Sequence, residues 1–365
     1  MNFDFSDDQK YLREEARRFL HSAWPLGKLH ARMKAPDRSD RVLWQSIAGQ
    51  GWLGVAIPER YGGVGLGRLE LCIVAEEMGR VLAPLPFVST AGILAEALLV
   101  AGSEAQKAEL LPRIAEGTLI GCLATSEGPG RTDPASVAAI VADGKLTGTK
   151  LPVTDGGSAD VALVLAQEGG TTGVYLAMLD GVERAPLATL DPTRETAALI
   201  FADTPATRLG GVELLDALRD RAAVLIAFEQ IGGADRALEM ALGYASERYA
   251  FGRPIGSYQA IKHKLADIYV KNELARANAY YAAWAYATGD AGLPAAASAA
   301  RIAASDAFWF AARENLHVHG GMGYTSEADC HLFYRRARQL SLVIGSPSTW
   351  KERLMAQIEN RAAAA

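Results

Sequence analysis

The stretch that decides the fold is Glu247-Arg248-Tyr249-Ala250-Phe251-Gly252-Arg253-Pro254-Ile255-Gly256-Ser257-Tyr258-Gln259-Ala260-Ile261-Lys262-His263. Its glycine and proline punctuation predicts the end of one helix, a turn, and a second helix capped by Ser257. An anion fits such a turn, because an arginine fork can project there beside free backbone amides. The alternative interpretation is an ordinary helix hairpin in which Arg248 and Arg253 are plain surface residues.

Helical sequence surrounds this turn and continues from Gly211 to the end of the chain. Glycine and proline punctuate it at four places: 252–257, 289–294, 320–323 and 345–347. That spacing predicts four long helices in an antiparallel bundle. An alanine-rich face over 295–312 predicts close helix packing, because small side chains let two helices approach each other.

Between residues 119 and 212 the pattern changes to short apolar runs. The runs are IGCLAT, SVAAIVA, ADVALVLA, VYLAML and AALIFAD, and the segments between them are rich in glycine, proline and aspartate. Runs of this length between turn residues predict strands, and therefore a small β domain.

The first part of the chain has helical patterns instead. Ser6 with Gln9, and Ser103 with Gln106, form two predicted capping boxes ahead of apolar residues at helical spacing. Two further apolar stretches, 68–81 and 89–100, predict buried helices. The fold class is α+β, with an N-terminal helical domain (1–118), a central β domain (119–212) and a C-terminal four-helix bundle (213–365).

Composition excludes several classes of protein. With 37 basic and 42 acidic side chains and a formal net charge of -5, a basic nucleic-acid binder is disfavoured. No apolar run is long enough for a membrane helix, and the acidic start MNFDFSDDQK differs from a signal peptide, so a cytoplasmic location is expected. Cys72, Cys122 and Cys330 lie far apart, which predicts reduced thiols and neither a disulfide framework nor a zinc site.

A second glycine cluster, His317-Val318-His319-Gly320-Gly321-Met322-Gly323-Tyr324, interrupts the predicted bundle. Glycines let a backbone approach a flat or phosphorylated ligand and leave amides free to donate. A metal site at His317 and His319 is disfavoured, because side chains two positions apart on a helix diverge and no third ligand accompanies them.

Together the two clusters resemble the acyl-CoA dehydrogenase family, and the resemblance covers nearly the whole chain. The matching motifs are Arg248-x-x-Phe251-Gly252-x-x-Ile255-x-x-x-Gln259 and His319-Gly320-Gly321-x-Gly323-Tyr324. Weaker support comes from Ile57-Pro58-Glu59-x-Tyr61-Gly62-Gly63 and from Ala75-Glu76-Glu77-Met78-Gly79-Arg80. The α, β, α order inferred above is also that family's architecture.

The resemblance implies that flavin adenine dinucleotide (FAD) binds between the β domain of one subunit and the bundle of a neighbour. It assigns Arg248 to the pyrophosphate and Phe251 to the surroundings of the flavin. It places Gln259, Gly320 and Gly321 near the cofactor across the dimer. Where the family usually has a glutamine, this chain has His317, which can also donate a hydrogen bond.

The β domain keeps the family's flavin motifs less well. Hydroxyls remain at Ser126, Thr132 and Thr154, and the resemblance makes these cofactor contacts, although such hydroxyls are as often turn-formers. A tryptophan of the family is replaced by Pro152, and a glycine is replaced by the bulky Arg131.

A catalytic base is not found where the family places one. Counting from the two motifs puts the alternative base positions at Ile344 and Ala222, and neither residue is an acid. The nearest carboxylates, Asp220 and Glu229, are rotated off the helix face of Ala222. Asp220 is the best alternative within this chain, because only a small shift in register would bring it into place.

A chain that keeps the diphosphate motifs and lacks the base resembles the shorter, non-catalytic subunits of heteromeric acyl-CoA dehydrogenases, which act in sterol side-chain and dicarboxylate degradation. The ending Gly345-Ser346-Pro347-Ser348 is similar to theirs. The expected function is α,β-dehydrogenation of an acyl-CoA in an oligomer, most simply a tetramer, either heteromeric or homomeric. The alternative is a structural subunit that only completes the cofactor site of its partner.

Overall fold

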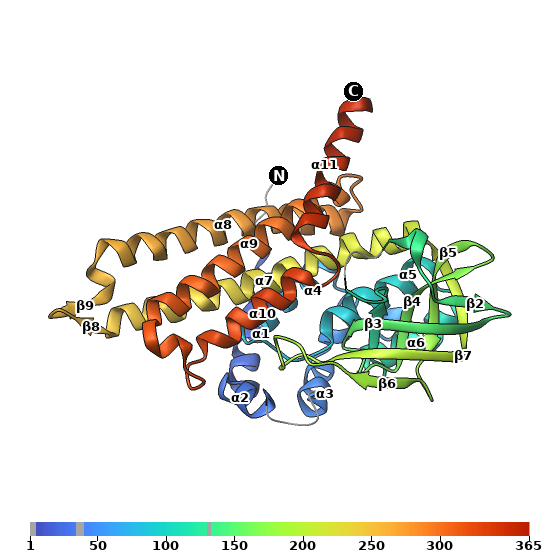
Figure 1. Cartoon of the computed structure of the whole chain (residues 1–365), viewed down its shortest axis with the longest axis horizontal. Coiled ribbons are helices and arrows are strands. Elements are labelled where there is room, and N and C mark those ends of the chain that lie inside the picture. The colour runs from blue at the N-terminus through green and yellow to red at the C-terminus, as the bar shows by residue number, and fades with distance from the viewer. Residues whose placement is uncertain (1–4, 34–39, 130–132, 365) are drawn as a thin grey trace. The chain divides into compact units, whose positions relative to one another are not determined.

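The structure is a computed structural model that describes residues 5–33, 40–129 and 133–364. Contacts divide the chain into two compact units, the first containing 1–31, 72–83 and 223–365 and the second containing 32–71 and 84–222. Helices come first along the chain, strands follow, and helices complete it (Figure 1), so the predicted α+β class is confirmed. The domain boundaries at 118 and 212 stay predictions.

Both predicted capping boxes are present. The N–H of Gln9 donates to the Ser6 hydroxyl at 3.2 Å ahead of α1 (Asp7–Ala23), and the N–H of Gln106 donates to Ser103 at 3.2 Å ahead of α6 (Glu104–Ala115). The other helical segments before the sheet are α2 (Gly27–Met33), α3 (Arg41–Gly49), the 3₁₀ turns η1 (Trp52–Gly54) and η2 (Glu59–Tyr61), α4 (Arg68–Arg80), the π-helical segment η3 (Val88–Leu94) and α5 (Ala95–Ala101).

The β domain contains a ring of hydrogen-bonded strands. Its strands are β1 (Gly121–Ala124), β2 (Ile140–Ala142), β3 (Lys145–Thr154), β4 (Val161–Glu168), β5 (Thr171–Met178), β6 (Glu183–Pro186) and β7 (Thr196–Gly211). Strand β4 pairs with β2, β2 with β3, β3 with β7, β7 with β5, and β5 again with β4. Strand β1 joins β4 in parallel, and β6 joins β7. Each of the five predicted runs contributes a strand, and the closed pairing protects most strand edges.

The C-terminal part contains α7 (Val212–Glu247), α8 (Gln259–Thr288), α9 (Leu293–His319), α10 (Cys330–Leu342) and α11 (Pro347–Ala364). Helix α9 buries seven alanines, as the alanine-rich face predicted, and packs against α8, α10 and α11. Helix α11 adds a fifth helix to the four that the spacing predicted (Figure 1). Of the helices in the described ranges, none combines the length and apolar character required to span a membrane.

One local prediction is wrong. Ser257 does not cap α8, because its hydroxyl donates to the carbonyl of Pro254 at 2.7 Å within the 3₁₀ turn η5 (Ile255–Ser257). The N-cap position belongs to Tyr258, which provides no side-chain cap. The carbonyl of Pro254, three residues before Ser257, takes the hydroxyl that the prediction had assigned to the amides of α8.

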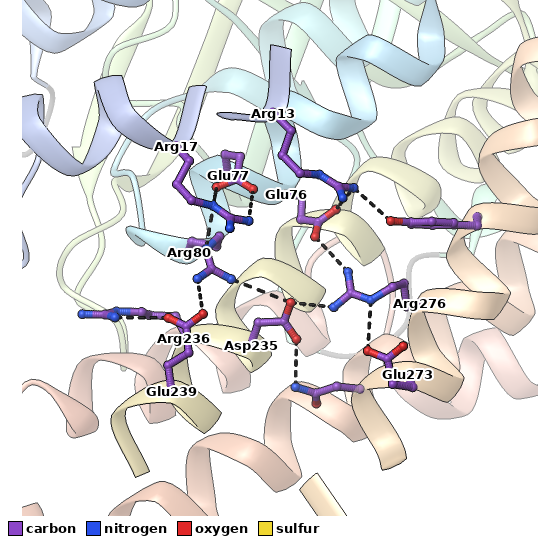
Figure 2. Close-up of polar contacts among 12 residues, drawn as sticks. Arg13, Arg17, Glu76, Glu77, Arg80, Asp235, Arg236, Glu239, Glu273 and Arg276 are labelled. Atoms are coloured by element: carbon purple, nitrogen blue, oxygen red, sulfur yellow. Dashed lines mark hydrogen bonds and ion pairs between the residues drawn. The ribbon is translucent and has the colours of Figure 1, made fainter. Parts of the chain in front are cut away.

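A network of ion pairs joins α1, α4, α7 and α8 in the first unit (Figure 2). Glu76 on α4 lies at its centre, 1% exposed, and accepts hydrogen bonds from Arg13 at 3.2 Å and Arg276 at 2.9 Å. The other members are Arg17, Glu77, Arg80, Asp235, Arg236, Glu239, Asn272, Glu273 and Tyr280. Burial raises the pKa of Glu76, and the two arginines oppose that rise. The network therefore fixes α1 and α4 against the long helices α7 and α8.

Candidate functional site

The segment after α7 forms a tight hairpin. Strands β8 (Tyr249–Ala250) and β9 (Arg253–Pro254) pair in antiparallel register, and Phe251 and Gly252 make the turn with φ of 52° and 79°. The hairpin lies at the end of α7 and α8 that is remote from α11 (Figure 1). Phe251 is 97% exposed, so the turn holds a large aromatic side chain away from the rest of its own unit.

Backbone contacts fix the base of this hairpin. The N–H of Ile255 donates to the carbonyl of Arg248 at 2.8 Å, and the Tyr258 hydroxyl donates to the carbonyl of Ala250 at 2.9 Å. The side chains of Arg248 and Gln259 are exposed on either side of it. The hairpin thus leaves the side chain of Arg248, the predicted pyrophosphate ligand, exposed.

The second glycine cluster begins where α9 ends, in the 3₁₀ segment η6 (Gly320–Tyr324). A Cβ built on Gly320 or Gly321 would meet no atom within 4 Å, whereas one on Gly323 would lie 2.5 Å from the carbonyl oxygen of Leu316. Gly320 also has a φ of 58°, which favours glycine. Gly323 is therefore required for packing, while Gly320 and Gly321 leave an open stretch of backbone that a ligand can approach.

A stacked pair brings the two clusters together. The rings of Tyr244, near the end of α7, and His319, at the end of α9, stack with centroids 4.2 Å apart. The Nδ1 atom of His319 lies 2.9 Å from the carbonyl oxygen of Asn315. Arg248 follows Tyr244 by one helical turn and Gly320 follows His319 directly, so the two predicted ligand-binding segments lie beside each other in one unit.

His317 and His319 point to different partners. His317 is exposed, and its Nδ1 atom lies 3.4 Å from the Lys264 ammonium and 3.6 Å from a Glu314 oxygen. Glu314 also bonds to Lys264 and, at 3.0 Å, to Arg313. Burial opposes its ionisation, but these two cations prevail and lower the pKa of Glu314. His317 therefore belongs to a charged group with Lys264 and Glu314, whereas His319 contacts Asn315 and Tyr244.

The β-domain hydroxyls belong to the second unit. Ser126 donates to the carbonyl of Gly128 at 3.0 Å, so its hydroxyl serves the turn, as the alternative interpretation allowed. Thr132 and the neighbouring Arg131 lie outside the described residues. Thr154 ends β3, and its side chain is half-buried.

Glu127, the residue after Ser126, stabilises the turn in which Ser126 lies. Glu127 accepts from Lys150 at 2.6 Å and from the N–H groups of Ala138 and Ala139 at 2.7 and 2.8 Å. Burial opposes its ionisation, yet these donors lower the pKa of Glu127. Lys150 is fully buried, and burial lowers its pKa. The pair thus fixes the loop that carries Ser126.

Asp155 was not singled out from the sequence, although it follows Thr154 directly and fixes the end of β3. It is 3% exposed, adopts a φ of 62°, and binds the Arg194 guanidinium at 2.9 and 3.1 Å. The Ser89 hydroxyl donates to it at 2.5 Å, and its own N–H donates to the carbonyl of Glu195. The available signal was the residue type, because aspartate and asparagine tolerate this left-handed conformation.

The two predicted base positions hold apolar residues in different units. Ile344 lies in the first unit, half-buried, at the turn that follows α10. Ala222 lies on α7 in the second unit and is fully buried. Asp220, two residues before Ala222 on the same helix, is also buried, at 4% exposure, and lies about 200° around the helix from Ala222. The assignment of Asp220 as an alternative base stays a prediction.

Two other buried carboxylates form ion pairs with arginines. Glu229 lies 3.5 Å from the Arg336 guanidinium. Glu96, which the sequence analysis did not single out, is 1% exposed and lies 2.9 Å from Arg68 and 3.2 Å from Arg221. Both carboxylates therefore have arginine partners within the fold.

Comparison with known protein families gives two matches. Residues 6–118 match the acyl-CoA dehydrogenase N-terminal domain, and residues 211–358 match the acyl-CoA dehydrogenase C-terminal domain. The chain is 34% identical to the acyl-CoA dehydrogenase IpdE2 of Mycobacterium tuberculosis over 354 residues, which span 96% of this chain and 98% of that protein.

Solved structures are similar over the same length. A Tcur3481-Tcur3483 steroid ACAD variant has a TM-score of 0.90 and 31% identity, covering 98% of this chain and 99% of the other. The ChsE4-ChsE5 complex from Mycobacterium tuberculosis has a TM-score of 0.90 and 27% identity, with the same coverage.

Proposed function

Since this chain belongs to the acyl-CoA dehydrogenase family of oxidoreductases, we propose that it is one subunit of a FAD-dependent enzyme that introduces an α,β double bond into an acyl-CoA. In this proposal a second, related chain supplies the catalytic base. The observation that carries the proposal is the contrast between two regions: Arg248 and the open glycines are kept, whereas Ile344 stands where an acid is expected.

The residues present fit the diphosphate of FAD. The exposed Arg248 guanidinium can make charge-assisted hydrogen bonds, and the open backbone at Gly320 and Gly321 can come close to phosphate oxygens. Phe251 supplies an apolar surface for the flavin of a neighbouring subunit. When bound, FAD supplies the hydride acceptor for the β-carbon of the substrate.

The acidic residues of this chain indicate which subunit abstracts the α-proton of the substrate. An apolar side chain at positions 344 and 222 cannot abstract the α-proton, and Glu96 and Glu229 are held by arginines. Asp220 remains the competing base within this chain. We therefore assign this subunit to cofactor binding and assembly, and its partner to proton abstraction.

Exposed apolar groups support an oligomer, for which we propose a tetramer. Along one side of α8, Val270, Leu274 and Tyr281 recur at helical spacing and are 53%, 60% and 45% exposed. Contiguous apolar residues on an otherwise packed bundle are typical of a protein interface. Two of the similar solved structures carry paired names, Tcur3481-Tcur3483 and ChsE4-ChsE5, which supports a heteromeric assembly.

For the substrate we propose an acyl-CoA with a steroid or steroid-derived acyl group. The support is the name of the similar Tcur3481-Tcur3483 steroid ACAD, at 31% identity over nearly the whole chain.

The test is to purify this chain alone and together with a related acyl-CoA dehydrogenase-like chain from the same genome that carries the glutamate missing at position 344. Alone it should carry well below one FAD per chain, and together they should form a yellow complex that reduces a dye acceptor when acyl-CoA is added. Loss of activity when the partner's base is replaced would support the proposal. A homotetramer of this chain with stoichiometric FAD, bleached by acyl-CoA, would overturn it.

Arg248→Ala tests the cofactor assignment in that complex. Removing a charged hydrogen-bond partner should weaken FAD binding by about 2 kcal/mol, roughly 30-fold. The matched control is Arg253→Ala on the same hairpin, where the guanidinium carbon lies 4.0 Å from the centroid of the Tyr258 ring. Equal FAD content in the two variants after gel filtration would contradict the assignment.

A further inference from the structure

Arg301 is a fully buried arginine on α9, and its hydrogen bonds within the described residues all go to uncharged groups. One nitrogen donates to the Gln230 amide oxygen at 2.6 Å and to the Ser305 hydroxyl at 2.7 Å. The other nitrogen donates to the carbonyl of Leu340 and, at 3.1 Å, to the carbonyl of Val343. Burial lowers the pKa of Arg301, and the negative charge of Glu229 partly offsets this decrease. Because burying such a charge is costly, its retention calls for a role.

The two carbonyls belong to the turn that follows α10. Helix α10 ends at Leu342, and the N–H of Val343 still donates to Gln339 at 3.3 Å. Ile344 then adopts a φ of 58° and Gly345 a φ of 127°. A β-branched residue rarely adopts the left-handed conformation, because its side chain crowds the backbone. Such a residue stays there only where the surroundings hold it.

The turn is also held on its far side. The N–H of Thr349 donates to the Ser346 hydroxyl at 3.3 Å, and that hydroxyl lies 2.8 Å from the hydroxyl of Ser348. Arg301 therefore anchors the chain before Ile344, and Ser346 anchors it after. Residue 344 is the strained link between these two anchors.

We propose that Arg301 is a positioning residue that keeps this turn left-handed, so that the side chain at position 344 has one fixed place. An arginine suits the task, because its planar fork serves two carbonyls at once and its charge faces the negative end of the α10 dipole. Lysine offers a single point charge and cannot match that geometry. The role of Arg301 in the turn is independent of the proposed function, which adds only that position 344 is the expected place of a base.

The test is a double-mutant cycle on the purified full chain, with Arg301→Met, Ile344→Gly and both changes together. The readout is amide hydrogen exchange of a peptide covering 340–346, with a peptide from α8 as internal reference. Arg301→Met should speed exchange in the turn by about tenfold or more when Ile344 is present. With glycine at 344 the same change should have a severalfold smaller effect, because glycine adopts this φ without strain. Arg338→Met, an exposed arginine of α10, is the matched control and should change nothing.

Two outcomes would overturn the proposal. One is an equal effect of Arg301→Met in both backgrounds, since a residue that only packs the core acts independently of the strain at 344. The other is faster exchange spread over α9 with none at 340–346. If Arg301→Met does not fold, Arg301→Lys carries the same test, with the same dependence on Ile344 expected at smaller size.

Discussion

Two glycines allow α4 and α7 to touch through their backbones in the first unit. A Cβ on Gly232 would lie 1.9 Å from the carbonyl oxygen of Glu76, and a Cβ on Gly79 would lie 1.9 Å from that of Glu229. Both distances are about 1.5 Å short of an ordinary contact. Since the obstacle is backbone and not a flexible side chain, Gly232→Ala must push the two helices apart.

The expected cost follows from what this displacement disturbs. Overpacking of a well-packed contact costs about 1–3 kcal/mol. The shift also moves Glu76 away from Arg13 and Arg276, and loss of geometry in a buried ion pair costs a few kcal/mol more. The higher helix propensity of alanine offsets about 1 kcal/mol of this loss of stability. We therefore expect Gly232→Ala to lower the free energy of unfolding by about 3 kcal/mol.

The measurement is urea unfolding followed by circular dichroism, with the midpoint and slope compared between variants. The control is Gly243→Ala on the same helix, where a Cβ would meet nothing within 4 Å. It should raise the free energy of unfolding by about 0.5–1 kcal/mol, because alanine is the better helix former. If Gly232→Ala proves as stable as Gly243→Ala, the close approach of α4 and α7 is refuted.

Three further predictions concern the site. The pKa of Glu127 is lower in the folded protein than its value of 4.5 in the unfolded chain. The ionised Glu127 side chain therefore stabilises the fold above pH 4.5, and this stabilisation is lost as the pH falls through the pKa of the folded state. Glu127→Gln should therefore lower the free energy of unfolding at pH 7 by about 2 kcal/mol and flatten its acid dependence, and equal slopes below pH 5 in urea titrations would contradict this. Asp220→Asn should leave turnover of the assembled complex nearly unchanged; a loss of about 10²- to 10⁴-fold with FAD still bound would place the base in this chain. Phe251→Ala should leave the unfolding free energy of the chain within about 0.5 kcal/mol of wild type, because the side chain is exposed, yet lower the FAD content of the complex measured by absorbance.

Local sequence rules determined the secondary structure and the family. The capping boxes at Ser6 and Ser103 were predicted correctly, because a cap and its partner lie three residues apart and need no tertiary contact. The five apolar runs were predicted as strands for a similar reason, since the length of an apolar run and the turn residues that bound it are local features of the sequence. The two glycine-containing motifs identified the family, which the domain matches confirmed.

The tertiary structure alone decided which distant residues meet. Ser89, Asp155 and Arg194 form one buried group although they come from three separate segments. Tyr244 stacks on His319 and so places the two ligand-binding motifs side by side. Pairings of this kind depend on how helices and strands pack, and sequence spacing carries no signal for them. The wrong prediction of Ser257 as a helix cap has the same cause. Its hydroxyl could bond to the helix amides or to the carbonyl of Pro254, and the path of the turn decides between them.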